Sequence, residues 1–449
     1  MQRFKTPAKI AQSLARYCPS PLRSVLDPAV GDGALLIPLL RGRQESHLEV
    51  TAIDIDPSVI KPLRAALSAF SRKVTLHRGD FLEWAERHGG SVLQFDCVIM
   101  NPPFSSKKET FRRVRDAVMG GSGVRSTAIE AGFVIAAVRM LRPGGRLLAI
   151  LPPSVITSDS FVWLRKFLLS TGRIHTVHEL PHFSFENVEA RMYLLVFEKG
   201  GVASGLLLQN HDLDHSTNLP IEHTSLGGAY RMDFGFHDGL RRYTRLRSRS
   251  KLRWVALSGA ADVLRGSRKT PVTDAAWVIH TTDFEGGFWY CNQSRHRCRR
   301  TSSVCARAGD ILVKRVGRAC SSSFGMVLGA VGGECTDCVL VVRPKLGVRT
   351  DRLLFAIRTL TAFPFLRPLL ERGTGAAYMS KRGLECIEFP IDLYLRLPTI
   401  FGAYQRALSQ KSLATMLRLE EEAKRELERL TQSVRRRRNL RNKSLTLNP

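Results

Sequence analysis

Short apolar segments of strand length alternate with helical segments through residues 1–200. The predicted strands lie within Val25 to Asp27, Val50 to Asp56, Val74 to Phe81, Asp96 to Met100 and Leu147 to Leu151. An apolar helix that begins at Glu130 separates the last two. Strands that alternate with helices are typical of α/β folds in which the strands lie parallel. The pattern therefore predicts an α/β domain with a mostly parallel sheet.

Polar residues follow several of these strands, at the edge where open α/β sheets bind ligands. The first strand leads into Gly31-Asp32-Gly33, and glycine allows positive φ angles and a close approach of a ligand to the backbone. Asp54 and Asp56 end the second strand, and Asp80 follows the third. Each feature alone also fits an ordinary turn or a helix cap. Capping alone does not readily explain such features at successive strand ends.

The fourth strand ends in Asn101-Pro102-Pro103-Phe104. The asparagine side-chain oxygen and the Pro102 carbonyl can present two acceptors to one amino group, with an aromatic ring beside them. Such a site suits methylation of an exocyclic amine. Asn-Pro also initiates ordinary turns after strands, so the neighbouring motifs must decide between the two interpretations.

The second half of the chain has a different pattern. From about residue 251 it consists of short strands, paired glycines and basic turns, which predict a mixed α+β domain. Near the C-terminus a seven-residue apolar rhythm, interrupted by Glu420, predicts one amphipathic helix too short for a stable coiled coil. Its apolar positions are Leu413, Met416, Ala423, Leu427, Leu430 and Val434. We expect Arg435 to Arg438 and the rest of the tail to be disordered. The predicted domains are 1–245, 246–400 and 401–449, the last being the helix and its basic tail.

Charge narrows the class of partner. A formal net charge of +28 and a pI of about 10.4 favour a polyanion. Residues 1–200 hold 27 Lys and Arg against 18 Asp and Glu, whereas residues 201–449 hold 41 against 22. The larger excess lies in the second half. An apolar content of 44% is sufficient for buried cores and excludes a disordered basic chain.

The sequence gives no sign of a membrane, a disulfide framework or a metal. No stretch approaches the roughly 18 apolar residues of a membrane span, and the N-terminus lacks the apolar core of a secretory signal. We therefore expect a cytoplasmic protein whose nine cysteines are free thiols. Cys335 and Cys338, with Cys298 and Cys305 upstream, form a candidate zinc set, but the upstream spacing is too long for typical ligands. No metal is expected.

The order of the motifs resembles S-adenosylmethionine-dependent adenine-N6 DNA methyltransferases, specifically the gamma-arranged ones of type I, type II and type IIG restriction-modification systems. Phe4-Lys5-Thr6-Pro7, the glycine turn, Asp54, Asp80-Phe81 and Asn101 to Phe104 carry the resemblance, which spans at least residues 4–198. It implies a Rossmann-like methyltransferase domain that binds S-adenosylmethionine. The methionine part would lie on Thr6-Pro7 and the glycine turn, the ribose on Asp54, and the adenine on Asp80 and Phe81. The implied cofactor-binding residues are Thr6, Pro7, Asp27, Gly31, Gly33, Asp54, Ile55, Asp80 and Phe81.

Three residues depart from the family's usual pattern. Val30 and Asp32 stand where cysteine and serine are frequent, and Phe104 stands where tyrosine is commoner. The glycine positions are intact, and phenylalanine stacks on a base as tyrosine does. None of the three substitutions removes a group that the reaction requires.

The resemblance implies that Asn101, Pro102 and Phe104 are catalytic. The two acceptors would bind both N6 hydrogens, so that catalysis depends on positioning and electrostatics. A base in a duplex must flip out, at a cost of a few kcal/mol, and one aromatic stack contributes about 1–3 kcal/mol. A second aromatic face is therefore expected. Alignment of the strand ends favours Phe185 over Phe183 for that face, and core packing is the alternative interpretation of Phe185.

The second half resembles the target recognition domain of type I specificity subunits and of related type II methyltransferases. Such a domain reads base edges in the major groove and binds phosphates through basic side chains. The candidate DNA-binding residues are Lys107 and Lys108 in the first half and Arg268, Lys269, Lys314, Arg315, Arg318, Lys381 and Arg382 in the second. A generic basic surface is the alternative.

These observations predict a site-specific DNA methyltransferase that modifies N6 of a flipped adenine in double-stranded DNA, within a restriction-modification or phage-defence system. Because the first motif begins at residue 4, we expect any restriction endonuclease to be a separate polypeptide. The expected oligomeric state is a monomer or weak dimer. The alternatives are methylation of cytosine N4, of an RNA base or of a protein glutamine, and a non-catalytic DNA-binding specificity module. The sequence does not identify the DNA site.

Overall fold

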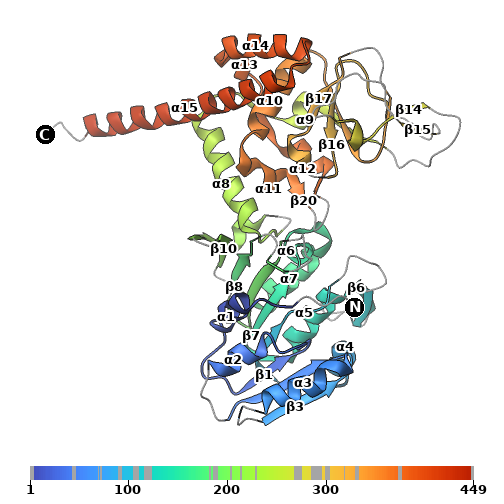
Figure 1. Ribbon diagram of the computed structural model, residues 1–449. Coiled ribbons are helices and arrows are strands. Elements are labelled where there is room, and N and C mark those ends of the chain that lie inside the picture. The colour runs from blue at the N-terminus through green and yellow to red at the C-terminus, as the bar shows by residue number, and fades with distance from the viewer. Residues whose placement is uncertain are drawn as a thin grey trace. The chain divides into compact units, whose positions relative to one another are not determined.

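A nine-stranded sheet is the centre of the first unit, Met1–Phe234, in the computed structural model of the chain (Figure 1). Its strands are β1 (Ser24–Asp27), β2 (Glu49–Asp54), β3 (Lys73–Arg78), β4 (Phe95–Met100), β7 (Leu141–Leu151), β8 (Gly172–Glu179), β9 (Tyr193–Lys199), β10 (Leu206–Asp212) and β11 (His215–Ile221). They are ordered β11-β10-β8-β9-β7-β4-β1-β2-β3. β9 and β11 run antiparallel to their neighbours, and all other pairs are parallel. The predicted α/β class with a mostly parallel sheet is confirmed.

Two apolar cores cover the two faces of this sheet. Side chains alternate along a strand, so Cys97 and Ile99 of β4 enter one core, and Val98 and Met100 enter the other. The first core contains α1 (Ala8–Ala15), α2 (Leu36–Arg41) and α3 (Pro57–Leu67). The second contains α4 (Phe81–His88), α5 (Ile129–Met140), α6 (Pro153–Thr157) and α7 (Val162–Thr171). A hairpin of β5 (Phe111–Arg115) and β6 (Val124–Ala128) precedes α5, and short 3₁₀ turns lie at Asp159–Phe161 and His223–Leu226.

The second unit, Gly235–Pro449, is built on a four-stranded antiparallel sheet. The strands β13 (Ala261–Arg265), β19 (Val339–Pro344), β16 (Ile311–Lys314) and β17 (Phe324–Met326) lie in that order. Ile311 and Val313 face a helical core, whereas Leu312 faces a smaller core with Val339 and Val341. Other strands pair as β12 (Trp254–Ala256) with β22 (Glu388–Pro390), β14 (Ala276–Ile279) with β15 (His296–Cys298) and β18 (Glu334–Cys335), and β20 (Glu371–Arg372) with β21 (Tyr378–Met379).

The helices of the second unit lie mainly after its sheet in sequence. α8 (Phe234–Arg249) leads in from the last residue of the first unit, and α9 (Leu257–Ala260) precedes β13. The later helices are α10 (Thr350–Thr361), α11 (Arg367–Leu370), α12 (Lys381–Cys386), α13 (Leu393–Arg396), α14 (Pro398–Ser409) and α15 (Leu413–Leu445), with 3₁₀ turns at Thr281–Asp283, Cys320–Ser322 and Pro364–Leu366. α10 is largely buried in the helical core, which it shares with α14 and α15. The structure thus combines an α/β unit with a mixed α+β unit.

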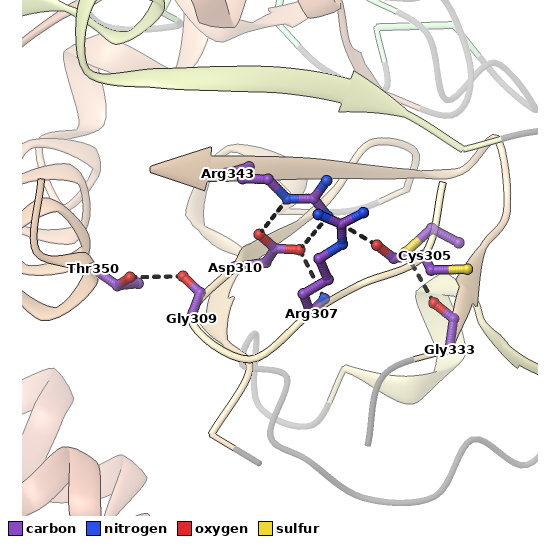
Figure 2. Close-up of polar contacts among 8 residues, drawn as sticks. Cys305, Arg307, Gly309, Asp310, Gly333, Arg343 and Thr350 are labelled. Atoms are coloured by element: carbon purple, nitrogen blue, oxygen red, sulfur yellow. Dashed lines mark hydrogen bonds and ion pairs between the residues drawn. The ribbon is translucent and has the colours of Figure 1, made fainter. Parts of the chain in front are cut away.

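An arginine fixes the turn that precedes β16 (Figure 2). The guanidinium of Arg343 donates to both carboxylate oxygens of Asp310, at 2.9 and 2.8 Å, and to the Cys305 carbonyl at 2.9 Å. The Arg307 main-chain N–H also donates to Asp310, at 2.8 Å, and Thr350 donates to the Gly309 carbonyl at 2.7 Å. Asp310 is buried, and its charge is balanced by a two-point arginine contact.

α15 differs from the predicted C-terminal segment in two respects. Glu420, which interrupts the apolar rhythm, is buried and accepts from Arg358 of α10 at 3.0 Å and from Tyr404 of α14 at 3.2 Å. The prediction of a disordered tail from Arg435 is wrong as far as Leu445, because the helix continues to that residue. Arginine and leucine are good helix formers, and the segment from Leu413 to Asn448 contains no glycine or proline.

The structure describes residues 5–42, 47–68, 70, 73–88, 94–104, 111–115, 124–181, 184–185, 191–202, 205–212, 215–227, 230–266, 276–284, 296–298, 304–317, 319–328, 333–372 and 377–445. Lys107, Lys108, Arg268, Lys269 and Arg318 lie outside these ranges. Within them, no single helix is long and apolar enough to span a membrane. One bent pair, α10 with Pro364–Leu370, passes on length and composition alone, and it packs in the core of the second unit. The predicted three-domain division stays a prediction.

Candidate active site

A cavity of about 430 Å³ lies where β1, β2, β3 and β4 end. These strands are parallel, so their carboxyl ends meet at one edge of the sheet. The cavity is lined by Lys5, Thr6, Asp27, Pro28, Ala29, Val30, Gly31, Asp32, Ala34, Leu35, Asp54, Ile55, Asp56, Val59, Gly79, Asp80, Phe81, Asn101, Pro102, Pro103, Ile129 and Phe133. Segments far apart in the sequence thus meet at the edge that the strand-end pattern predicted.

Asp54 connects the end of β2 to the glycine turn after β1. Its carboxylate accepts from the Gly31 N–H at 2.8 Å and from the Asp56 N–H at 2.9 Å. Gly31 has a φ of +54°, a conformation that favours glycine. Gly33, at +79°, has a different function, because a Cβ there would lie 2.9 Å from side-chain atoms of Ile37 and Leu63. Gly31 keeps the cavity floor open, whereas Gly33 lets the turn pack against α2 and α3.

The cavity has an acidic character. Asp27, Asp32, Asp54, Asp56 and Asp80 line it, together with the single cation Lys5 among the described lining residues. Lys5 lies 3.2 Å from Asp32, and both side chains are exposed. The arrangement is suited to a ligand that carries positive charge.

Asp27 is the most deeply buried of these carboxyl groups, with 1% of its surface exposed. Burial raises its pKa to about 8, and the nearby Asp54 adds to the increase. The Ala29 N–H, which donates to Asp27 at 3.2 Å, opposes it. Without a bound cation, the group therefore carries a proton at neutral pH.

Asn101 lies directly after β4, at one end of the cavity. Its Nδ2 donates to the hydroxyl oxygen of Thr6 at 3.1 Å, and Thr6 is buried. This bond orients the amide so that Oδ1 is the acceptor edge opposite Thr6. Pro102 follows and also lines the cavity, as the sequence predicted.

An apolar wall faces the carboxylates. Phe81 begins α4, and its ring centroid lies 5.0 Å from that of Phe133 in α5, with the rings tilted by 49°. Ile129, one turn before Phe133, completes the wall. The sequence predicted this helix only as an apolar element between two strands, and Ile129 and Phe133 were not among the predicted site residues. Their spacing of four residues at the start of a helix was the available signal.

Several predicted site residues do not line this cavity. Pro7 caps the start of α1, and Gly33 packs against the neighbouring helices. Phe104 is half-buried against the core of α1 to α3, and Phe185 is 3% exposed within the same core. This burial fits the packing interpretation of Phe185, and the proposed stack on a base stays a prediction. Phe183 lies outside the described residues.

The described DNA-binding candidates all belong to the second unit. Arg315 is mostly buried and donates to the main-chain oxygen of Asp337, so it has a structural contact. Lys381 lies 3.7 Å from Glu385, and Arg382 is exposed on the same helix, α12. Lys314 is half-buried at the end of β16. Their DNA contacts stay predictions.

The cysteines provide no metal site in the described part of the chain. Cys335 is buried in the smaller core, and the Cys338 thiol lies 3.6 Å from a carboxylate oxygen of Asp337. Among the described residues, no group of three or more His, Cys, Asp or Glu side chains is arranged to hold an ion.

Residues 2–218 match the family described as N-6 DNA Methylase. The chain is 27% identical over 232 residues to the type II methyltransferase M.TthHB8I of Thermus thermophilus, covering 49% of each chain. It is 28% identical over 155 residues to a tRNA1(Val) (adenine(37)-N6)-methyltransferase of Porphyromonas gingivalis, covering 34% of this chain and 59% of that one. The chain therefore spans about half the length of the curated relatives that it matches.

A solved structure shares the fold over nearly the whole chain. It is the type IIL restriction-modification enzyme MmeI in complex with DNA, with a TM-score of 0.50 and 10% identity, covering 96% of this chain and 72% of MmeI. At this identity the likeness concerns the fold alone. It includes the mixed α+β unit as well as the α/β unit.

The family implies S-adenosylmethionine as the cofactor, and the cavity fits that molecule. The acidic side chains complement its sulfonium and ammonium charges. The wall of Phe81, Ile129 and Phe133 provides an apolar surface for a flat ring, and Asp54 lies at the end of β2, where α/β nucleotide sites bind ribose. The cavity thus offers a partner for each part of the cofactor.

Proposed function

We propose that the protein is a site-specific methyltransferase that modifies N6 of adenine in double-stranded DNA, with S-adenosylmethionine as the methyl donor. One observation carries the proposal: a single cavity joins the acidic, apolar-walled cofactor site to Asn101 and Pro102. The cofactor motifs precede Asn101 to Phe104, and the basic region expected to recognise DNA comes after them, an order that supports the gamma arrangement. The N-6 DNA Methylase match over residues 2–218 supports this reaction class.

The cofactor site would hold the parts of S-adenosylmethionine in a fixed order. Thr6, Asp27 and the Gly31 turn would bind the methionine part, and Asp54 would accept hydrogen bonds from the ribose hydroxyls. Asp80 would bind the adenine edge, and Phe81 would pack on its face. Pro7 would support the site through helix α1, which it begins, and Gly33 through the glycine turn, which it lets pack against α2 and α3. Ile55 would contribute as a lining residue of the cavity. When bound, the cofactor supplies an electrophilic methyl group on sulfur.

Asn101 and Pro102 would then act on the target base. The N6 lone pair of adenine is delocalised into the ring, which makes the amino group a poor nucleophile. The Asn101 Oδ1 and the Pro102 carbonyl oxygen would accept the two N6 hydrogens and favour a pyramidal nitrogen that points its lone pair at the methyl group. The bond from Asn101 to Thr6 supports this role, because it fixes the orientation of the amide before the base arrives.

The base must leave the duplex to reach this site. Phe104 would stack on one face of the flipped adenine, and Phe185 would offer the second face. Both rings belong to the same apolar core, so they start from neighbouring parts of the molecule. Because Phe185 is buried, its stacking requires a side-chain movement when the base enters.

The second unit would recognise the DNA sequence. The excess of basic residues beyond residue 200 and the likeness of the whole chain to MmeI, whose structure is described in complex with DNA, support this role. Lys107, Lys108, Arg268, Lys269, Lys314, Arg318, Lys381 and Arg382 remain the proposed phosphate or base contacts, with Arg315 as a supporting residue. The names of two relatives, a type II methyltransferase and a type IIL restriction-modification enzyme, support a restriction-modification role, and a separate endonuclease stays a prediction.

A second candidate is N6 methylation of adenine in RNA. It is favoured by the tRNA methyltransferase of Porphyromonas gingivalis, although that similarity covers 34% of this chain. The catalytic arrangement at Asn101 would serve either nucleic acid. That match covers only 155 residues, and the excess of basic residues beyond residue 200 favours DNA.

The test is to map methylated bases in DNA and in RNA after incubation with the purified chain and S-adenosylmethionine. We expect N6-methyladenine at one DNA sequence. Asn101→Ala should reduce methylation by at least about 100-fold, the scale seen when one preorganised hydrogen-bonding group is removed, while cofactor affinity stays nearly unchanged. Asn218→Ala on the edge strand β11 is the matched control and should retain full activity. Normal methylation by Asn101→Ala would reject the assignment, and modified RNA alone would select the second candidate.

A further inference from the structure

α8 carries a row of arginines that no motif of the methyltransferase accounts for. Arg241, Arg245 and Arg249 are four residues apart, so they lie along one side of the helix. Arg241 and Arg245 are exposed and Arg249 is half-exposed. With a rise of 1.5 Å per residue, the row is about 12 Å long, which is the axial rise of three to four phosphates in one DNA strand. We call these three residues the α8 arginine row.

The opposite side of α8 is fixed to the second unit. Tyr243 and Leu246 are each 6% exposed in its helical core. The Tyr243 hydroxyl donates to the Glu388 carbonyl at 3.0 Å and accepts from the Glu388 N–H at 3.0 Å. Gly239 packs so closely on the Phe365 carbonyl that a Cβ there would lie 2.4 Å from the oxygen. The arginine row is therefore presented by a helix whose rotation is determined by packing.

The row has no acidic partners among the described residues. Two other arginines of α8 are paired, Arg242 with Asp238 at 2.8 Å and Arg247 with Glu388 at 2.6 Å. By contrast, the described part of the chain gives Arg241, Arg245 and Arg249 no ion pair or side-chain hydrogen bond. Residues 239–249 contain five arginines and no acidic residue. Among the described residues, no acidic side chain pairs with the three arginines of the row.

A purely structural explanation accounts for only part of the row. Arginines in the last turn of a helix interact favourably with its dipole, by about 0.3–1 kcal/mol, and this covers Arg249. Arg241 lies two turns earlier, where the effect has vanished. Like charges four residues apart are also unfavourable, by roughly 0.2–0.5 kcal/mol per pair. α15 shows the alternative arrangement, because its Lys424 and Arg429 pair with Glu421 and Glu426.

We propose that the α8 arginine row is a binding surface for the phosphate backbone of double-stranded DNA. It rests on the proposed function, since the DNA that it binds is the substrate of that reaction. The row makes no base contacts. It increases affinity for any sequence and holds the second unit on the duplex while other residues read the bases.

The experiment measures DNA affinity of the full chain by fluorescence anisotropy at several salt concentrations, with a short duplex of arbitrary sequence. The variant carries Arg241→Gln, Arg245→Gln and Arg249→Gln. Each lost phosphate contact should lower the slope of log K against log salt by about 0.9, so the triple variant should lose about 2.7. At about 0.1 M salt this corresponds to a roughly 500-fold loss of affinity. The sequence that becomes methylated should not change.

The matched control removes three exposed basic residues from helices of the first unit, through Arg41→Gln, Lys61→Gln and Arg64→Gln. It has the same net charge as the triple variant and should keep the wild-type slope to within about one contact. Circular dichroism confirms that both variants are folded. An unchanged slope in the α8 variant, an equal loss in the control, or a loss confined to an RNA duplex would overturn the proposal. If the wild-type chain bound DNA in a salt-dependent manner but did not methylate it, the proposed function would be rejected. The α8 arginine row would still be tested by the difference in salt slope between the wild type and the triple variant.

Discussion

In the first unit five aspartates line one cavity, whereas in the second unit two buried acidic side chains, Asp310 and Glu420, are each bound by an arginine. The cavity carboxylates have one cation, Lys5, among the described residues that line it. In the second unit, Asp310 is bound by Arg343 at two points and Glu420 by Arg358. The five cavity aspartates are thus available to a ligand, whereas Asp310 and Glu420 are occupied by internal contacts.

This difference separates two kinds of binding within a single basic chain. A net charge of +28 would by itself favour polyanions everywhere on the surface. The cavity keeps a local negative field, which suits a cationic cofactor, while arginines such as those of α8 remain for a polyanion. The location of the charges therefore carries more functional information than their sum.

The largest expected effect comes from breaking a buried pair of the second unit. Arg358 and Glu420 are each 4% exposed, and Arg358 also donates to the Ser322 and Phe324 carbonyls at 3.0 Å. Arg358→Met should lower the free energy of unfolding by about 3–5 kcal/mol, because it leaves the Glu420 carboxylate buried without its cation. Chemical denaturation followed by circular dichroism measures the change.

Arg429→Met on α15 provides the control for this variant. Its pair with Glu426 is exposed, with 73% of the arginine side chain accessible, so its removal should change stability by less than about 1 kcal/mol. If the two variants had the same small effect, the buried pair of Arg358 and Glu420 would stabilise the second unit no more than an exposed pair does.

The next effect concerns a cavity carboxylate of the first unit. Asp54→Ala should weaken binding of S-adenosylmethionine by about 10- to 100-fold, because it removes hydrogen bonds of roughly 1.5–3 kcal/mol from a charged acceptor. The variant also releases the Gly31 N–H, which Asp54 accepts at 2.8 Å. Calorimetric titration measures the affinity. Glu83→Ala, an exposed residue of α4 outside the cavity, should bind normally, and equal binding by Asp54→Ala would reject the assigned ribose contact.

The features that the sequence predicted correctly have local causes. The glycine turn, Asp54, Asp80 and Asn101 each follow an apolar strand within a few residues, so alternation and strand ends identify them. Since the strands are parallel, predicting the sheet also predicts that these ends meet. The cavity lining contains all four features.

The features that were missed depend on contacts between distant segments. The bond from Asn101 to Thr6 joins residues 95 positions apart, and that from Arg358 to Glu420 joins residues 62 apart. α5 is apolar on every side, so the four-residue spacing of Ile129 and Phe133 at its start was the only signal that they line the cavity. Glu420 occupies a buried position of α15 although it is charged, because Arg358 of α10 binds its carboxylate. The sequence shows only an interruption of the apolar rhythm at this position. Such partners become visible only once the chain is folded.

The final prediction uses the protonation of Asp27 to test whether the cavity was shaped for a cation. Burial raises its pKa to about 8, so the cofactor-free protein holds a proton there at neutral pH. The contribution of this group to stability is full below its ordinary pKa of 3.8 and is lost as the pH rises from there through about 8, because the unfolded chain gives up this proton while the buried carboxyl group keeps it. A bound cation would favour the ionised carboxylate. Affinity for S-adenosylmethionine should therefore rise as the pH approaches 8, with release of a proton on binding.

Calorimetry in two buffers with different ionisation enthalpies measures that proton. Asp27→Asn should release none, and its affinity should not vary with pH over this range, because an amide does not titrate. Asp32→Asn, on the exposed side of the same turn, should behave like the wild type. If the wild-type protein bound the cofactor without losing a proton, Asp27 would keep its proton beside the ligand. The negative field of the cavity would then come from the other four aspartates, Asp32, Asp54, Asp56 and Asp80, alone.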